Sequence, residues 1–258
     1  MNIHDKVVIV TGGAGGIGRA MAQRFRTAGA RAVVIADLHA DAVAATAKDI
    51  DCHGAVVDVS KEDQVIGLID DTEARHGPVD LFCANAGIGN AGGLDADNSA
   101  WQRNWDINVM AHVCAARHLV PRMLERGGGY FLHTASAAGL LSQFEASYAV
   151  TKHAAVAFAE WLSITYGDRG IGVSCLCPMG VDTAMFNSLP PDQRERTAAG
   201  HLLSPEQVAE VVLQGIENEQ FLILPHEEVL DFWRAKTNDN ERWLRGMRRF
   251  HALLEDGG

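Results

Sequence analysis

Short apolar segments recur along the chain and alternate with longer segments of helical periodicity. The apolar segments are rich in Val, Ile and Leu and almost uninterrupted by polar residues, which is typical of strands covered on both faces of a parallel sheet. We predict strands at Lys6–Val10, Arg31–Ala36, Gly54–Val59, Val79–Ala84, Gly129–Thr134, Gly172–Cys177 and Phe221–Leu224. We predict helices at Ile17–Ala28, Ala40–Lys48, Lys61–His76, Ser99–Glu125, Ser147–Tyr166 and Pro205–Asn218. This order predicts an α/β fold, a doubly wound sheet of seven mainly parallel strands with helices on both faces.

The pattern shows no linker or internal repeat, so we expect residues 1–258 to form a single domain. One long irregular segment, approximately 181–203, follows the sixth predicted strand, and irregular segments of this length often cover a substrate site. We predict a C-terminal helical tail at residues 225–258. This tail has an apolar stripe, which we attribute to packing against the core or another subunit. The stripe consists of Trp243, Met247, Phe250 and Leu254.

Composition and charge narrow the class of partner. The chain has 258 residues, of which 47% are hydrophobic and 21% charged, an ordinary composition for a globular protein. The net charge of −11 argues against nucleic acid or an anionic membrane as a partner, because no basic surface offsets it. We therefore expect a small-molecule substrate.

The cysteines and the N-terminus bear on the compartment. The five cysteines are odd in number and match neither a disulfide scaffold nor a metal-binding pattern, so we expect free thiols and no metal site. The first residues lack an apolar signal segment, and no apolar run approaches the ~20 residues of a membrane span. We expect a cytoplasmic protein.

A glycine-rich segment links the first predicted strand to the first helix, in the order Thr11-Gly12-Gly13-Ala14-Gly15-Gly16-Ile17-Gly18. Glycines allow a tight turn and a close approach of a pyrophosphate, and the helix N-terminus offers unpaired N–H groups. This context predicts a dinucleotide site. Asp37 ends the second strand 19 residues after Gly18, where a carboxylate accepts hydrogen bonds from the adenosine ribose and repels a 2′-phosphate. The expected cofactor is NAD rather than NADP.

Tyr148 and Lys152 lie one helical turn apart in a predicted helix, so the phenol and the ammonium can face one site. A free phenol has a pKa of about 10 and is a poor base at neutral pH. Lowering that pKa by about 3 requires roughly 4 kcal/mol, which a charge about 4 Å away supplies at an effective dielectric of about 20. The spacing alone is weak evidence, because such pairs are usually solvated neighbours.

Taken with these features, motifs along nearly the whole chain resemble the short-chain dehydrogenase/reductase family, which has a Rossmann-like fold. Besides the glycine turn and the Tyr148–Lys152 pair, the resemblance rests on segments that follow the predicted strands or lie in the long helix. These are Asp58-Val59, Asn85-Ala86-Gly87, Asn108, Ser136, Pro178-Met179-Gly180 and Thr183.

The resemblance implies hydride transfer between a secondary alcohol and NAD. Tyr148 would be the proton-transferring base, and Lys152 would lower its pKa and bind the nicotinamide ribose. Ser136 would bind the substrate oxygen, and Asn108 would hold a water on the proton path. Residues implied to contact the cofactor are Gly12, Gly16, Ile17, Gly18, Asp37, Asp58, Val59, Asn85, Ala86, Gly87, Tyr148, Lys152, Pro178, Gly180 and Thr183.

The substrate-binding loop departs from the family pattern. Ser136 and Tyr148 are twelve residues apart, where the family commonly has thirteen, and the missing residue falls in 140–146. The residues expected to line the substrate pocket are mostly apolar, which predicts a largely hydrophobic secondary alcohol or ketone. They are Leu141, Gln143, Phe144, Met179, Met185, Phe186 and Leu189.

Two other functions fit the same fold. An NADPH-dependent reductase of 3-oxoacyl thioesters would need a basic face and a phosphate-accepting pocket, which the net charge and Asp37 oppose. A non-catalytic NAD-binding regulator would have no need of the complete Asn-Ser-Tyr-Lys set. The family commonly forms dimers or tetramers through its two long helices, so we expect a homodimer or homotetramer, with Trp105, Phe158 and Trp161 at the interface.

Overall fold

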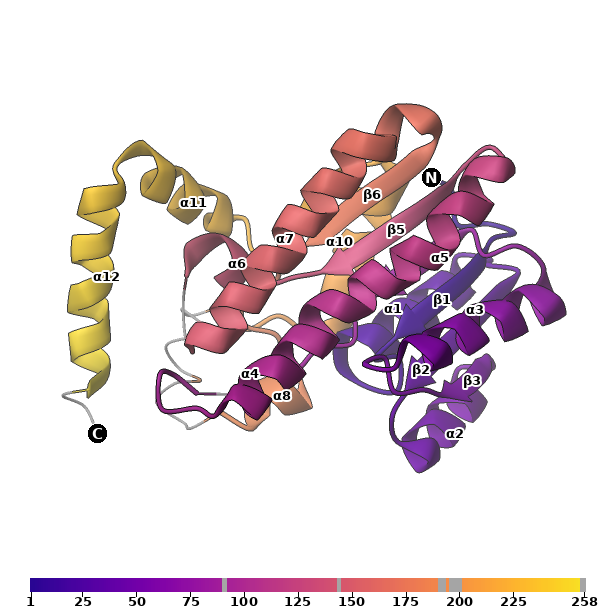
Figure 1. Ribbon diagram of the computed structural model, residues 1–258, viewed down its shortest axis with the longest axis horizontal. Helices are drawn as coiled ribbons and strands as arrows, with labels where there is room; N and C mark the ends of the chain where they lie inside the picture. The colour runs from indigo at the N-terminus through magenta and orange to yellow at the C-terminus, as the bar shows by residue number, and fades with distance from the viewer. Residues whose placement is uncertain (90–91, 143–144, 190–193, 195–200, 256–258) are drawn as a thin grey trace.

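The computed structural model describes residues 1–89, 92–142, 145–189, 194 and 201–255, with only the backbone described at 250, 251 and 253–255. A seven-stranded sheet in the order β3-β2-β1-β4-β5-β6-β7 runs through the molecule, and every neighbouring pair of strands is parallel. The predicted α/β fold is confirmed (Figure 1). The strands are β1 Val7–Thr11, β2 Ala32–Asp37, β3 His53–Val56, β4 Leu81–Ala84, β5 Gly129–Thr134, β6 Ile171–Leu176 and β7 Leu222–Ile223.

Helices cover both faces of this sheet, which explains why its strands lack polar alternation. Five of the six predicted helices are observed with ends shifted by at most one residue, and the sixth, Ser99–Glu125, is divided. They are α1 Gly16–Thr27, α2 Ala40–Asp49, α3 Glu62–His76, α4 Asn98–Trp105, α5 Ala111–Glu125, α7 Ala146–Tyr166 and α10 Pro205–Glu217. Two short helices, α6 Ala138–Leu141 and α8 Ala184–Asn187, occur in loops.

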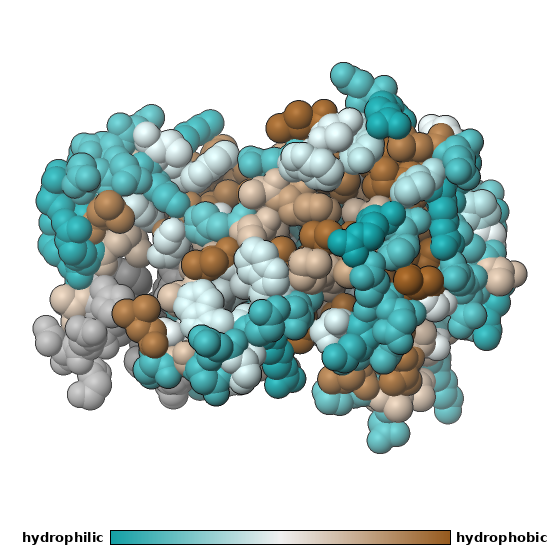
Figure 2. All heavy atoms as spheres, in the orientation of Figure 1, coloured by the Kyte–Doolittle hydropathy of each residue, from teal (hydrophilic) through white to brown (hydrophobic). Residues whose placement is uncertain are grey.

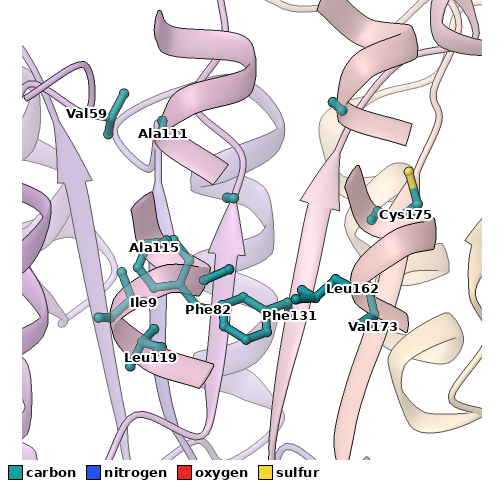
Figure 3. Close-up of a cluster of buried hydrophobic side chains, with 14 of the residues drawn as sticks. Ile9, Val59, Phe82, Ala111, Ala115, Leu119, Phe131, Leu162, Val173 and Cys175 are labelled. Atoms are coloured by element: carbon teal, nitrogen blue, oxygen red, sulfur yellow. The ribbon is translucent and has the colours of Figure 1, made fainter. Parts of the chain in front are cut away.

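Two apolar cores hold the layers together. One joins the sheet to α3, α5 and α7, where Phe82 and Phe131 from neighbouring strands pack near Leu119 of α5 (Figure 3). The other joins the opposite face to α1 and α10 around the fully buried Phe25. Each phenyl side chain removed from water contributes roughly 2–3 kcal/mol, so the cores fix the strand ends that carry the site.

The long helix predicted at Ser99–Glu125 is not one regular α-helix. A π-helical segment, Asp106–Met110, separates α4 from α5. A π-helical turn re-aims the side chains around it, and such turns occur often at functional sites. Here the segment contains Asn108.

The predicted C-terminal helix is two helices, α11 Glu228–Asn238 and α12 Asn240–Glu255, separated at Asp239. In Figure 1, α12 extends away from the body of the molecule, and Figure 2 shows mainly hydrophilic residues on the visible face of this arm. Trp243 and Met247 of the predicted stripe are partly exposed. The side chains of Phe250 and Leu254 lie outside the described residues.

The cysteines of the chain are free thiols, as predicted. Cys175 and Cys177 have their sulfur atoms 3.8 Å apart in the core. Within the described residues, no helix has both the length and the apolarity that crossing a bilayer requires.

Candidate active site

The site lies where the strand order reverses, between β1 and β4, at the carboxyl ends of the strands. In doubly wound sheets this is where the loops diverge and leave a crevice. A pocket of about 560 Å³ occupies this position. It is lined both by the glycine turn after β1 and by Ser136, Tyr148 and Lys152.

The glycine turn is packed too closely for larger side chains. Gly12 has φ +64°, and a Cβ there would lie 2.9 Å from the Ala86 Cα atom. A Cβ at Gly18 would overlap the Gly12 carbonyl oxygen. At Gly16, with φ +49°, a Cβ would lie 3.1 Å from the Thr183 methyl group. The turn thus leaves open backbone facing the pocket and brings Thr183 against it.

Two carboxylates lie beside this turn. Asp37 accepts hydrogen bonds from the main-chain N–H groups of Ala14 at 3.2 Å and Leu38 at 2.8 Å, which hold it at the pocket edge. Asp58 also lines the pocket and accepts bonds from the hydroxyl and N–H of Ser60. The hydroxyl bond is the main cause that lowers the pKa of Asp58. Regular pairing of the third strand ends at Val56, two residues before Asp58.

Asn85 joins three strands at the base of the pocket. Its amide nitrogen donates to the Thr11 carbonyl at 3.0 Å, and its amide oxygen accepts from the Thr134 hydroxyl at 3.1 Å. The Thr11 hydroxyl in turn accepts from the N–H groups of Asn85 and Ala86. This network ties the ends of β1, β4 and β5 and aims Asn85-Ala86-Gly87 along the pocket.

Tyr148 and Ser136 converge from α7 and from the loop after β5. The Ser136 hydroxyl accepts from the Ala138 N–H at 3.1 Å and interacts with the Tyr148 phenol. Burial raises the pKa of Tyr148 above its ordinary value, and the bond with Ser136 lowers it only in part. The expected net lowering of this pKa is not observed, because burial outweighs the groups that favour the phenolate.

Lys152 is buried, with 3% of its surface exposed. Its ammonium lies 5.7 Å from the centre of the Tyr148 ring and donates to the Thr134 carbonyl at 3.0 Å. Burial lowers the pKa of Lys152 to about 8, so the amine is still mainly an ammonium at neutral pH. An ammonium has three donors, and the one bond described for it leaves capacity for hydroxyl groups entering the pocket.

Asn108 is fully buried and its side chain is occupied by protein groups. The amide oxygen accepts from the Ile88 N–H at 2.9 Å, and the amide nitrogen donates to the Ile88 carbonyl at 2.9 Å and to the Thr151 hydroxyl at 3.1 Å. A Cβ at Gly87 would lie 3.1 Å from the Lys152 ammonium and 3.2 Å from the Asn108 oxygen. Glycine is therefore needed where the loop after β4 passes these two side chains.

The apolar wall of the pocket is formed by most of the residues predicted for the substrate. Met179, Met185, Phe186 and Leu189 line it, with Met185 43% exposed and Phe186 buried. The prediction that Leu141 lines the substrate pocket is wrong, because α6 places its side chain fully in the core. Gln143 and Phe144 lie outside the described residues.

The remaining predicted cofactor contacts are also gathered here. Ile17, Val59, Ala86, Gly87, Pro178 and Thr183 line the pocket, whereas Gly180 lies beside it and bonds through its carbonyl to the Leu203 N–H. Of the segment 181–203, the structure describes α8 and a bridge between Val181 and Leu203.

Sequence reasoning missed several groups. Glu145 and Arg103 line the pocket, and Glu145 accepts from the Gly92 N–H at 3.0 Å. The Thr134 main-chain carbonyl accepts a hydrogen bond from Lys152. Every residue has such a carbonyl, so the residue type at position 134 could not predict this contact. His226 bonds to the segment after β6, and its position past the last strand gave no local pattern.

The comparison with protein families decides the identity. The sequence profile described as short chain dehydrogenase matches residues 6–194, well over half of the chain. The chain belongs to the short-chain dehydrogenase family. It is an oxidoreductase, as the glycine turn and the Tyr148–Lys152 pair predicted.

Members of the family with similar sequence and structure cover almost the whole chain. The 1-deoxy-11-beta-hydroxypentalenate dehydrogenase of Streptomyces exfoliatus is 34% identical over 239 residues, covering 88% of this chain and 86% of its own. The cis-4-hydroxycyclohexanecarboxylate dehydrogenase of Sinomonas cyclohexanicum is 34% identical over 220 residues, covering 81% and 88%. A short chain dehydrogenase/reductase from Burkholderia phymatum, solved in complex with NAD, has a TM-score of 0.86 at 29% identity and covers 93% of this chain and 96% of its own.

Proposed function

We propose that this oxidoreductase transfers a hydride between NAD(H) and a largely hydrophobic secondary alcohol or ketone. The observation that carries the proposal is one pocket that contains both a glycine turn at a strand–helix junction and the Ser136–Tyr148–Lys152 cluster. The turn suits a dinucleotide, and the cluster suits proton transfer beside it. Bound NAD would supply the hydride acceptor.

In this proposal Tyr148 takes the hydroxyl proton in oxidation and returns it in reduction. Ser136 already interacts with the phenol, so a substrate oxygen between the two hydroxyls would accept or donate hydrogen bonds at the reacting centre. Lys152, with donors to spare, would hold ribose hydroxyls and stabilise the phenolate. Because the Asn108 side chain is committed to Ile88 and Thr151, we assign it the task of shaping the pocket. That Asn108 holds a water on the proton path stays a prediction.

The cradle fits the cofactor in two ways. At Gly16 a Cβ would narrow the space before Thr183, so the glycine keeps room for a pyrophosphate. The Asp37 carboxylate stands at the pocket edge, where it would accept from ribose hydroxyls and repel a 2′-phosphate. We therefore propose NAD rather than NADP as the cofactor, with Pro178, Gly180 and Thr183 near its nicotinamide end.

Cofactor titration tests this assignment. We expect NADH to bind at least about fivefold more tightly than NADPH, because two charges about 4 Å apart repel by about 1 kcal/mol even in water. Asp37→Asn should remove most of that preference, whereas Asp63→Asn, on an exposed carboxylate of α3, should keep it. Quenching of tryptophan fluorescence would measure both affinities, and tighter NADPH binding by the unsubstituted protein would reject the proposed cofactor.

The pocket wall supports a hydrophobic substrate. Met179, Met185, Phe186 and Leu189 offer apolar surface in the pocket that also contains Tyr148, and apolar surface gives little recognition of a polyol. Relatives named for hydroxypentalenate and hydroxycyclohexanecarboxylate act on hydroxylated carboxylates, which agrees with an alcohol substrate. Glu145 contributes a carboxylate to the same pocket.

We also propose that the chain forms one domain and assembles as a homodimer or homotetramer through α4, α5 and α7. Trp105 is 40% exposed, Trp161 53% and Ile164 85%, so α4 and α7 present apolar side chains that a subunit interface would cover. Phe158, the third predicted interface residue, is partly buried against the core and stacks on Trp161. A monomer mass from light scattering would contradict this assembly.

A further inference from the structure

His226 is a buried histidine, 2% exposed, whose two ring nitrogens both contact the main chain of the segment after β6. The Met179 N–H donates to Nδ1 at 3.2 Å, and Nε2 lies 3.1 Å from the Gly180 carbonyl oxygen. A main-chain N–H can only donate and a carbonyl can only accept. Nδ1 must therefore be bare and Nε2 must carry the proton, so one neutral tautomer satisfies both bonds.

The sheet register brings His226 to this place. Strand β7 pairs with β6 so that Cys175 faces Leu222 and Leu176 faces Ile223. Continued for three more residues, the same register sets His226 beside Met179. The main-chain ladder ends with the bond from the Cys177 N–H to the Ile223 carbonyl at 2.9 Å. Beyond that bond, the His226 imidazole supplies the hydrogen bonds to Met179 and Gly180 that strand pairing would otherwise provide.

The segment 178–180 is held on both sides. The Pro178 carbonyl accepts from the Ala137 N–H at 2.8 Å, and the Gly180 carbonyl accepts from the Leu203 N–H at 3.2 Å in addition to His226. Within the described part of the chain, His226 supplies the hydrogen bond to the Met179 N–H. Pro178 and Met179 line the pocket, whereas His226 does not.

We propose that His226 is a positioning residue that fixes residues 178–180 in the conformation that receives the nicotinamide end of the cofactor. This inference rests on the proposed function. His226 would act through Met179 and Gly180 and would set nicotinamide affinity without touching the cofactor. If residues 178–180 sample other conformations, the apparent affinity for the cofactor falls with the fraction of molecules in the binding conformation. Loss of the two hydrogen bonds to His226 should therefore weaken cofactor binding.

The tautomer makes this contact sensitive to acid. Protonation would turn Nδ1 into a donor that opposes the Met179 N–H. Burial is the main cause that lowers the pKa of His226. Glu228 and the main-chain carbonyls of Gly180 and His201 partly raise it, and the His201 imidazole has a smaller lowering effect. Because the lowered pKa lies below about 6.5, the contact is intact at neutral pH and is lost as the pH falls through that pKa.

The test compares NADH with ADP-ribose, which lacks the nicotinamide, on the full-length protein. Against the unsubstituted protein, His226→Phe should weaken NADH binding by at least about tenfold and change ADP-ribose binding by less than about twofold. His226→Gln offers an acceptor and a donor in one amide, so it should restore most NADH affinity and remove its loss in acid. His118→Gln, a partly exposed histidine of α5 that bonds to Glu62, is the matched control and should bind both ligands normally.

Unchanged NADH affinity in His226→Phe would overturn the inference, as would an equal loss of NADH and ADP-ribose. If His226→Phe does not fold, the pH dependence decides: acid weakening of NADH binding in the unsubstituted protein that persists in His226→Gln would overturn it. Absence of NADH binding in the unsubstituted protein would instead reject the proposed function, and this inference with it.

Discussion

Replacing Tyr148 with Phe is expected to reduce alcohol oxidation about 10²–10⁴-fold while NADH affinity stays within about twofold. The substitution removes one hydroxyl and keeps the ring, so the pocket wall beside Gly89 is preserved. Only the proton-transferring group and its interaction with Ser136 are lost. Initial rates of NADH formation and a fluorescence titration of NADH would measure the two quantities on the same preparation.

Tyr166→Phe is the control for this variant. Tyr166 ends the same helix, α7, and packs against Trp161 and Arg169 outside the pocket. We expect its turnover to be unchanged. Normal turnover by Tyr148→Phe would remove the phenol from the reaction, whatever the behaviour of Tyr166→Phe.

Gly18→Ala is expected to abolish NADH binding and to lower the free energy of unfolding by about 3 kcal/mol or more. The added methyl group would overlap the Gly12 carbonyl oxygen and lie 2.7 Å from the Asn85 amide nitrogen. The Gly12 oxygen belongs to the main chain, so no side-chain rotation relieves the overlap. The Asn85 amide nitrogen bonds to Thr11 and so ties β4 to β1. Urea unfolding and NADH titration would report the two effects.

Gly67→Ala provides the matched control. A Cβ at Gly67, within α3, meets no atom within 4 Å. Alanine is favoured over glycine in a helix by about 0.5–1 kcal/mol, so this variant should be slightly more stable and bind NADH normally. Tight NADH binding by Gly18→Ala would show that the turn does not approach the cofactor as closely as proposed.

Local chemistry explains why most of the fold could be predicted. The strands of the sheet are continuous apolar segments. In the turn from Gly12 to Gly18, the backbone conformation and close packing require glycine, so the glycines in the sequence reveal the turn. The family motifs then located Ser136, Tyr148 and Lys152, and the structure brings them to one pocket. Such features depend on neighbours in the sequence.

The features that escaped prediction depend on tertiary packing. The spacing of Tyr148 and Lys152 fixes their common face but not their burial, and burial determines the direction of both pKa shifts. Leu141 is as apolar as a pocket residue, yet the turn of α6 directs it into the core. His226 reaches Met179 through a strand pairing 47 residues apart in the chain, which no local pattern encodes.

The most direct test of the proposed reaction is a panel of secondary alcohols assayed with NAD for NADH formation. The proposal predicts turnover with hydrophobic secondary alcohols, little with polyols, and loss of that turnover in Tyr148→Phe. High turnover on sugars with none on apolar alcohols would contradict the proposed substrate. NADH binding without turnover of any alcohol or ketone would contradict the assignment of Tyr148 as the base.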